Sequence, residues 1–207
     1  MGTLIAVVGA SGVGKTTLVS ALNRLTLQRH ASEAAFETAY EGHTDRPFQS
    51  LFKQDARYAL ANQIDYYLFR ADQEKRLRAS PQIGLIDGGL DLDFHAFTRL
   101  FHHRHLLTDD EFELCQRMYE FIREYLPRPE LFIHMNADEN TIARRLSTRN
   151  RINIARTEDT ARFHSYVQEW LATIPADQIL ELDVTNEMLA YEQSVGMILD
   201  RIKTLQT

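Results

Sequence analysis

The chain has 207 residues, of which 44% are hydrophobic and 25% charged, a composition typical of a folded protein with one buried core rather than of a disordered or fibrous chain. Its formal net charge of −6 argues against a general nucleic-acid partner, because surplus Lys and Arg hold phosphate backbones. The single cysteine, Cys115, excludes an intramolecular disulfide framework and fits a reducing cytoplasm. The apolar stretch 4–8 is too short for a membrane span and follows no basic signal segment, so we expect a cytoplasmic protein without a membrane partner.

The predicted elements alternate between strands and helices along the chain. Residues 4–8 form a short, continuous apolar run typical of a buried strand, and a glycine-rich segment separates them from a helical pattern over residues 16–25. Further strands are predicted at residues 34–39, 83–86, 131–135 and 178–182, and further helices at residues 56–78, 94–103, 109–125, 139–147, 160–172 and 188–205. Such alternation indicates an α/β fold of three layers, in which a mainly parallel five-stranded sheet carries helices on both faces.

We expect residues 1–207 to form one domain, because no repeat, low-complexity tract or linker divides the chain. Residues 144–162 differ from the rest in being dense in arginine and poor in large apolar side chains, and they lie between two helical patterns. This segment is the best candidate for an arginine-rich, mobile lid.

The segment between the first strand and the first helix matches the phosphate-loop pattern G-x-x-x-x-G-K-T in full, as expected for a P-loop NTPase-type fold. Glycines let backbone N–H groups converge on a phosphate, and the N-terminus of the following helix adds partial positive charge. Lys15 is expected to reach the β- and γ-phosphates of ATP, and the Thr16 hydroxyl to ligate Mg²⁺. The alternative is a glycine-rich turn that merely links strand to helix. The predicted nucleotide-binding residues are Gly9, Ala10, Ser11, Gly12, Val13, Gly14, Lys15, Thr16 and Thr17.

A second acidic element follows the strand predicted at residues 83–86. Asp87 stands at its C-terminal end, where open α/β sheets gather their ligand contacts. The carboxylate is therefore a candidate Mg²⁺ ligand, direct or through water, that would neutralise charge on a transferred phosphoryl group. Alternatively, Asp87 caps the turn that begins at Gly88, since Asp-Gly is also a common turn signal.

With these landmarks placed, the chain resembles the deoxynucleoside kinase family, whose members transfer the γ-phosphoryl group of ATP to the 5′-hydroxyl group of a deoxynucleoside. The resemblance covers most of the chain. In the acidic motif an Asp and a Phe follow six and ten positions after the first residue, and the lid arginines are spaced by four and two. The matching residues are Glu41 before Asp45-Arg46-Pro47-Phe48, Gln63 and Arg70 on the long helix, the series Asp87, Asp93 and Phe97, and the lid residues Arg145, Arg149 and Arg151.

The resemblance implies a role for each of these positions. Glu41 would be the catalytic base, Asp93 would contact the nucleobase, and Phe97 would pack on it. Gln63 lies seven positions before Arg70, hence on the same helix face, and its amide offers a paired donor and acceptor to a base edge. The lid arginines suit phosphate oxygens because their planar forks remain charged. Read from the residues alone, Glu41 could instead be a solvated loop carboxylate, Gln63 a surface residue, and Asp93 the N-cap of the helix starting at residue 94.

The chain departs from the family pattern around the acceptor. Gly88 and Gly89 replace the family's Arg and Ser after the acidic residue, and Asn153 and Ile154 replace the lid carboxylates. Phe52 stands where the family has an aromatic hydroxyl that contacts the sugar 3′-hydroxyl, so the position is a substrate-binding candidate with altered chemistry.

We therefore expect a kinase that uses ATP and Mg²⁺ to phosphorylate a (deoxy)nucleoside at its 5′-hydroxyl group. Nucleotide or other small-metabolite kinases, and an ATPase or nucleotide-dependent switch without a small-molecule acceptor, remain alternatives. The resemblance also implies a homodimer. His95, His102, His103 and His105 lack acidic or thiol partners at metal-binding spacing, which favours a solvated helix end over a metal site.

Overall fold

The computed structural model describes residues 2–29, 36–40, 46–147, 159–187 and 191–205. Its centre is a sheet of five parallel strands in the order β2-β3-β1-β4-β5. Val7, in the central strand, pairs with Asp87 on one side and Ile133 on the other. The strands are β1 (Leu4–Gly9), β2 (Phe36–Ala39), β3 (Ile83–Asp87), β4 (Leu131–Asn136) and β5 (Ile179–Asp183).

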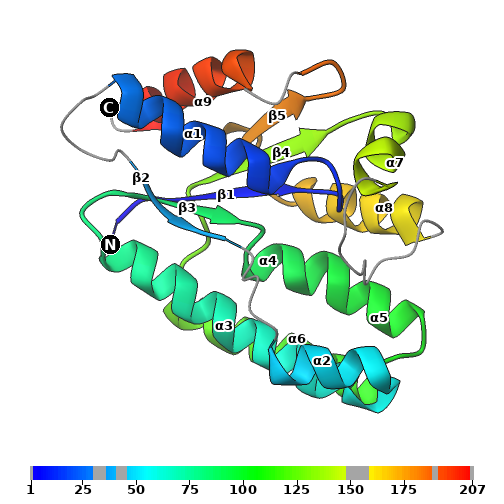
Figure 1. Cartoon of the computed structure of the whole chain (residues 1–207). Coiled ribbons are helices and arrows are strands. Elements are labelled where there is room, and N and C mark those ends of the chain that lie inside the picture. The colour runs from blue at the N-terminus through cyan, green and yellow to red at the C-terminus, as the bar shows by residue number, and fades with distance from the viewer. Residues whose placement is uncertain (1, 30–35, 41–45, 148–158, 188–190, 206–207) are drawn as a thin grey trace.

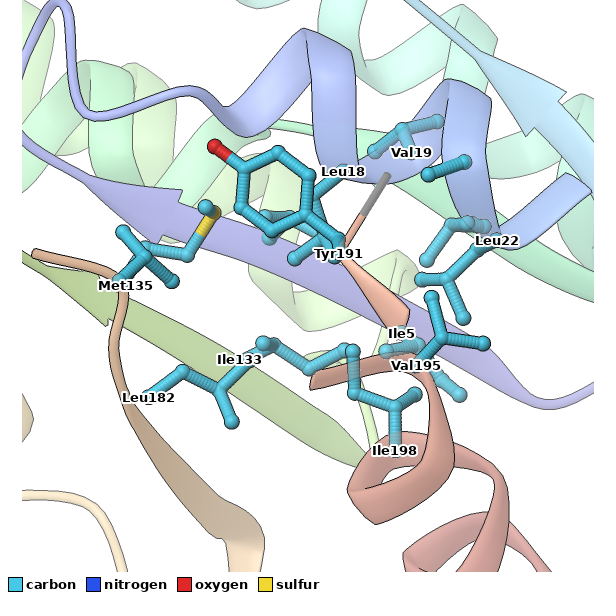
Figure 2. Close-up of a cluster of buried hydrophobic side chains, with 14 of the residues drawn as sticks. Ile5, Leu18, Val19, Leu22, Ile133, Met135, Leu182, Tyr191, Val195 and Ile198 are labelled. Atoms are coloured by element: carbon cyan, nitrogen blue, oxygen red, sulfur yellow. The ribbon is translucent and has the colours of Figure 1, made fainter. Parts of the chain in front are cut away.

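Parallel neighbours need crossover connections, and here helices supply them on both faces of the sheet (Figure 1). Helices α1 (Lys15–Arg29) and α9 (Glu192–Leu205) cover one face, where Ile5 and Val7 of β1 are buried against Val195 and Ile198 (Figure 2). The alternate residues of β1 face the opposite side, as the period of two in a strand requires.

The second face is covered by α3 (Ala59–Ala79), α8 (Thr160–Leu171) and a continuous helical stretch that follows β3. This stretch consists of α4 (Leu90–Leu92), the π-helical segment η2 (Asp93–Thr98) and α5 (Arg99–His103). Helix α6 (Asp109–Tyr125) packs against α3 on the side away from the sheet and buries Cys115 there. The remaining elements are α2 (Pro47–Gln54), η1 (Ala56–Tyr58), α7 (Glu139–Ser147) and η4 (Ala176–Gln178).

Local sequence signals explain where several helices begin. Thr108 accepts a hydrogen bond from the Glu111 backbone N–H at 3.3 Å, and the Glu111 carboxylate accepts from the Thr108 N–H at 2.8 Å, which is a complete capping box for α6. Pro47 occupies the first turn of α2, where its missing N–H costs nothing. Within the described chain, no helix is both long and apolar enough to cross a membrane.

The structure confirms the expected three-layer α/β fold, including all five strands. Two differences concern helices. Helix α2 was absent from the expected elements, because its eight residues are too few for a clear periodic pattern. The helix expected at residues 94–103 already begins at Leu90 and widens into a π-helical segment, a feature that depends on tertiary contacts.

Candidate active site

The phosphate loop connects the buried end of β1 to the first turn of α1, as the pattern predicts. Gly14 adopts a positive φ of 111°, and a Cβ atom at this position would lie 2.2 Å from the Tyr191 hydroxyl oxygen. Glycine is therefore required there both by the backbone conformation and by the space available. Ser11, Lys15 and Thr16 line a cavity in front of the loop, whereas Thr17 is exposed on α1.

Lys15 folds back onto the loop that precedes it. Its Nζ donates hydrogen bonds to the carbonyl oxygens of Gly9 at 3.0 Å and Ala10 at 3.1 Å. Phosphate oxygens are stronger acceptors for an ammonium group than neutral carbonyls are, because both partners then carry charge. The lysine side chain thus lies beside the expected position of the β- and γ-phosphates.

Asp87 ends β3 directly beside the phosphate loop. The Thr16 hydroxyl donates to its Oδ2 at 2.5 Å, while its Oδ1 is buried and has no hydrogen-bond partner among the described residues. The side chain therefore points toward α1 rather than capping the turn at Gly88. A buried carboxylate oxygen without a partner is costly unless a cation or water satisfies it. Thr16 and Asp87 hence fit a Mg²⁺ ion, which prefers a few hydroxyl and carboxylate oxygens together with water and phosphate.

The acceptor side of the cavity is built around Arg70 of α3. This guanidinium is 2% exposed and donates to the Asp93 carboxylate at 2.9 Å and to the Asp87 carbonyl at 3.0 Å. Gly88, with a φ of 86°, leaves it room, because a Cβ atom there would lie 3.0 Å from an Arg70 nitrogen. Asp93 lies inside the helical stretch that starts at Leu90, so its ion pair with Arg70 replaces the alternative N-cap role.

One cavity brings the phosphate loop and this acceptor side together. Phe97 and Leu92 supply the apolar part of its lining, beside the charged groups. Its lining residues are Ser11, Gly12, Gly14, Lys15, Thr16, Arg70, Gly88, Leu92, Asp93 and Phe97.

Two predicted substrate residues lie away from that lining. Phe52 packs on Phe101, with ring centroids 5.1 Å apart, in the apolar cluster between α3 and α6. Gln63 is 3% exposed and donates to the Thr98 hydroxyl at 2.6 Å. It is connected to the cavity indirectly, because Thr98 in turn donates to the Asp93 carbonyl.

Of the predicted catalytic residues outside the loop, Arg145 alone falls within the described part of the chain. Its guanidinium donates to the carbonyl oxygens of Val13 at 2.6 Å and Val184 at 3.0 Å, which ties α7 to the phosphate loop. The other three, Glu41, Arg149 and Arg151, lie outside the described residues, as do Asn153 and Ile154.

Sequence reasoning missed several residues that shape the site. Gln73 accepts from Arg70 at 3.1 Å and donates to the Tyr40 carbonyl at 2.8 Å, so it links the acceptor side to the end of β2. Tyr191 packs against Gly14 of the phosphate loop, and the Thr98 hydroxyl accepts a hydrogen bond from Gln63. Local sequence patterns could not identify these residues, because all three act through contacts distant in sequence.

The expectation of a solvated histidine cluster was wrong for His95. This ring is half-buried, stacks on Trp170 with centroids 5.3 Å apart, and shares a hydrogen bond of 3.2 Å with the Tyr119 hydroxyl. Burial lowers the pKa of His95 to about 4. His103 and His105 are exposed, in accordance with the expectation.

Comparisons with known proteins bear on the family and the fold of the chain. A family model described as deoxynucleoside kinase matches residues 5–206. A deoxyadenosine kinase of Dictyostelium discoideum is 25% identical over 150 residues, which make up 72% of this chain but 58% of that relative. Two structures of deoxyadenosine kinase from M. mycoides, one with the products dCMP and a flexible dCDP bound and one with dATP bound, match with a TM-score of 0.75. They cover 98% and 97% of this chain and 100% of their own chains, and at 16% identity they show the fold.

Proposed function

Because the chain belongs to the deoxynucleoside kinase family, we propose that it transfers the γ-phosphoryl group of ATP to the 5′-hydroxyl group of a deoxynucleoside. The observation that carries this proposal is the shared cavity, in which Lys15 and Thr16 of the phosphate loop face Arg70 and Asp93. A nucleotide switch that phosphorylates no acceptor would not need Arg70 and Asp93 in the same cavity. The names of the relatives support deoxyadenosine as the first acceptor to test.

The phosphate loop would hold the triphosphate of ATP. Lys15 would exchange its bonds to the carbonyls of Gly9 and Ala10 for bonds to the β- and γ-phosphates. Thr16 and Asp87 would hold Mg²⁺, which neutralises phosphate charge when it is bound. Arg145, Arg149 and Arg151 would add positive charge from the lid and keep water from the phosphoryl group.

Glu41 would position the acceptor and take the proton of its 5′-hydroxyl group. The hydroxyl oxygen then forms a bond to the γ-phosphorus while the bond to the β-phosphate oxygen breaks, and ADP leaves. Gln63, Arg70 and Asp93 would hold the base, and Phe97 would pack against it. The ion pair between Arg70 and Asp93 keeps both groups in place before the substrate arrives.

The test is to incubate the full chain with Mg-ATP and each of the four deoxynucleosides, and to measure ADP and nucleoside monophosphate together. We expect one ADP for each deoxyadenosine monophosphate formed. Lys15→Ala should lower kcat by about 100-fold or more, because it removes a charge aimed at the transferred group. Lys53→Ala, on the exposed surface of α2, is the matched control and should act as the wild type. ADP release with no phosphorylated acceptor would contradict the proposal.

We further propose a cytoplasmic homodimer in which residues 1–207 act as a single domain. Leu114, Phe121 and Tyr125 are exposed at intervals of seven and four positions, which places them on one face of α6. Leu68 is exposed on α3, the helix against which α6 packs. An apolar surface of this kind is typical of an interface with a second copy. The single cysteine supports the cytoplasmic assignment.

A further inference from the structure

The Thr98 hydroxyl is the centre of a buried hydrogen-bond cluster beside the candidate active site. Thr98 is 0% exposed and lies at the end of the π-helical segment η2. Its Oγ1 lies 2.6 Å from Gln63 Nε2, 2.5 Å from the Tyr67 hydroxyl oxygen and 3.0 Å from the Asp93 carbonyl oxygen. A threonine hydroxyl has one proton to donate and two lone pairs to accept, so these three partners use its full capacity.

The direction of each bond follows from counting protons. The Asp93 carbonyl can only accept, so it takes the single Thr98 proton. Burial raises the pKa of the Tyr67 hydroxyl well above its usual range, so Tyr67 stays protonated and donates to Thr98. The remaining lone pair of Thr98 must then receive a proton from Gln63, which requires the amide nitrogen on that side.

This arrangement fixes the amide orientation of Gln63. Turning the amide by 180° would place Oε1 against Thr98, where two acceptor oxygens would face each other without a proton between them. Oε1 itself receives no hydrogen bond from the described residues. Gln63 therefore keeps one acceptor oxygen and one N–H for another partner. The positions of these two groups are fixed, because the amide cannot rotate to exchange them.

We propose that Thr98 is a specificity-determining positioning residue, which locks the Gln63 amide so that the site distinguishes amino bases from keto bases. The inference rests on the proposed function and extends it. Adenine and cytosine present an amino donor beside a ring acceptor, whereas guanine and thymine present a carbonyl acceptor beside a ring N–H. An amide that can rotate by 180° can pair with either pattern, whereas an amide held in one orientation can pair with only one of them. With deoxyadenosine as acceptor, the locked orientation is the one that favours amino bases.

Thr98 also connects the amide to the rest of the acceptor side. The carbonyl that takes its proton belongs to Asp93, whose carboxylate binds Arg70 at 2.9 Å. The π-helical segment spans the six residues from Asp93 to Thr98, and the Thr98 hydroxyl donates back across it to the Asp93 carbonyl. Gln63 and Asp93 are thus set relative to each other by one buried side chain that does not line the cavity.

The experiment compares kcat/KM for the four deoxynucleosides with Mg-ATP in the full-length wild type and three variants. Thr98→Val keeps the shape but removes the acceptor, and we expect the ratio of amino to keto bases to fall by about tenfold or more. Thr98→Ser keeps the hydroxyl and should hold that ratio within about threefold. Tyr67→Phe removes a bond from the same cluster but leaves Thr98 as acceptor for Gln63, so it should lose thermal stability while keeping the ratio.

The outcomes separate this inference from the proposed function. If the wild type phosphorylates none of the four nucleosides, the proposed function itself fails. If it phosphorylates all four with equal kcat/KM, or if Thr98→Val lowers all four values alike, the amide lock is wrong. Loss of the ratio in Tyr67→Phe as severe as in Thr98→Val would point to packing and also overturn it. Should Thr98→Val not fold, Thr98→Ala makes the same comparison without the branched side chain.

Discussion

The Tyr191 side chain lies against Gly14 of the phosphate loop. Tyr191 has the left-handed φ of 52°, unusual for a bulky residue, and is 2% exposed. Figure 2 shows its ring among the apolar side chains, with the hydroxyl directed away from Ile198. The Tyr191 ring packs against the loop, so the loop cannot shift toward it to accommodate a side chain at residue 14.

Gly14→Ala should therefore abolish nucleotide binding. Its Cβ atom would meet the Tyr191 hydroxyl oxygen at 2.2 Å, and its φ of 111° adds strain of about 1–3 kcal/mol. Isothermal titration with ATP measures the effect. Gly196→Ala is the matched control, since its Cβ atom meets nothing within 4 Å and lies in α9, where alanine adds up to about 1 kcal/mol of stability. ATP binding by Gly14→Ala at wild-type affinity would contradict the geometry.

His95 makes the stability of the protein depend on pH. Burial holds the pKa of His95 at about 4, below its usual value of about 6.5 in an unfolded chain. The unfolded chain therefore binds more protons between these values, and stability falls as the pH drops from about 6.5 to 4. The loss attributable to this ring is up to about 3 kcal/mol.

Urea unfolding at a series of pH values measures this loss. His95→Phe keeps the stack on Trp170 but removes the titration, so its stability should fall less steeply than that of the wild type over the same range. The exposed His103 provides the control variant, His103→Phe, with an unchanged slope. Equal slopes for His95→Phe and the wild type would show that His95 titrates normally. The pKa of His134 is also lowered by burial, and it contributes equally to all three proteins.

At the scale of elements, Arg123 joins three helices in a buried ionic cluster. From α6 it donates to the Glu74 carboxylate of α3 at 2.7 and 3.0 Å and to the Asp91 carboxylate of α4 at 2.7 Å. Tyr119 donates to the other oxygen of Asp91 at 2.6 Å. Glu74 is 0% and Asp91 2% exposed, and Arg123 is the one buried cation paired with them among the described residues, since Arg128, 3.7 Å from Asp91, is exposed.

Arg123→Met should lower the free energy of unfolding by about 3–5 kcal/mol, because it leaves two buried carboxylates without their main cation. Urea denaturation monitored by circular dichroism gives the value. Arg117→Met changes the same residue type on the exposed side of α6 and should alter stability by about 0.5 kcal/mol or less. A similar small effect for Arg123→Met would mean that the cluster is neutral in net energy.

The elements also show why some of the site was predictable and some was not. The positions of Lys15, Thr16 and Asp87 could be predicted from local signals. All three lie at or shortly after the C-terminal end of a buried strand, and ligands bind at the C-terminal ends of the strands in open α/β sheets. The family resemblance predicted Phe52 near the sugar, yet a matching position carries no side-chain direction, and this ring packs on Phe101. The role of Thr98 depends on a π-helical turn and on a partner 35 positions away, neither of which leaves a periodic trace.

At the scale of the whole molecule, the exposed face of α6 predicts self-association. Phe121 and Tyr125 are 57% and 66% exposed, and their rings contact each other at 5.1 Å between centroids. Phe121→Glu should convert a dimer into a monomer, because it places a charge in the centre of an apolar contact. Sedimentation velocity at micromolar concentration distinguishes the two. Met197→Glu alters an exposed apolar residue on α9 instead and should remain dimeric. A monomeric wild type would reject the dimer.

The strand order of the sheet has a consequence for the synthesis of this protein on the ribosome. The first strand lies in the middle of the sheet, and Ile5 finds one of its pairing partners only at Leu131. At translation rates of about 5–20 residues per second, the nascent chain waits on the order of ten seconds before that partner is made. During this interval the apolar run from Leu4 to Val8 has an unpaired edge. Expression at lower temperature or with added chaperones should accordingly raise the yield of folded protein, with no change to the native state itself.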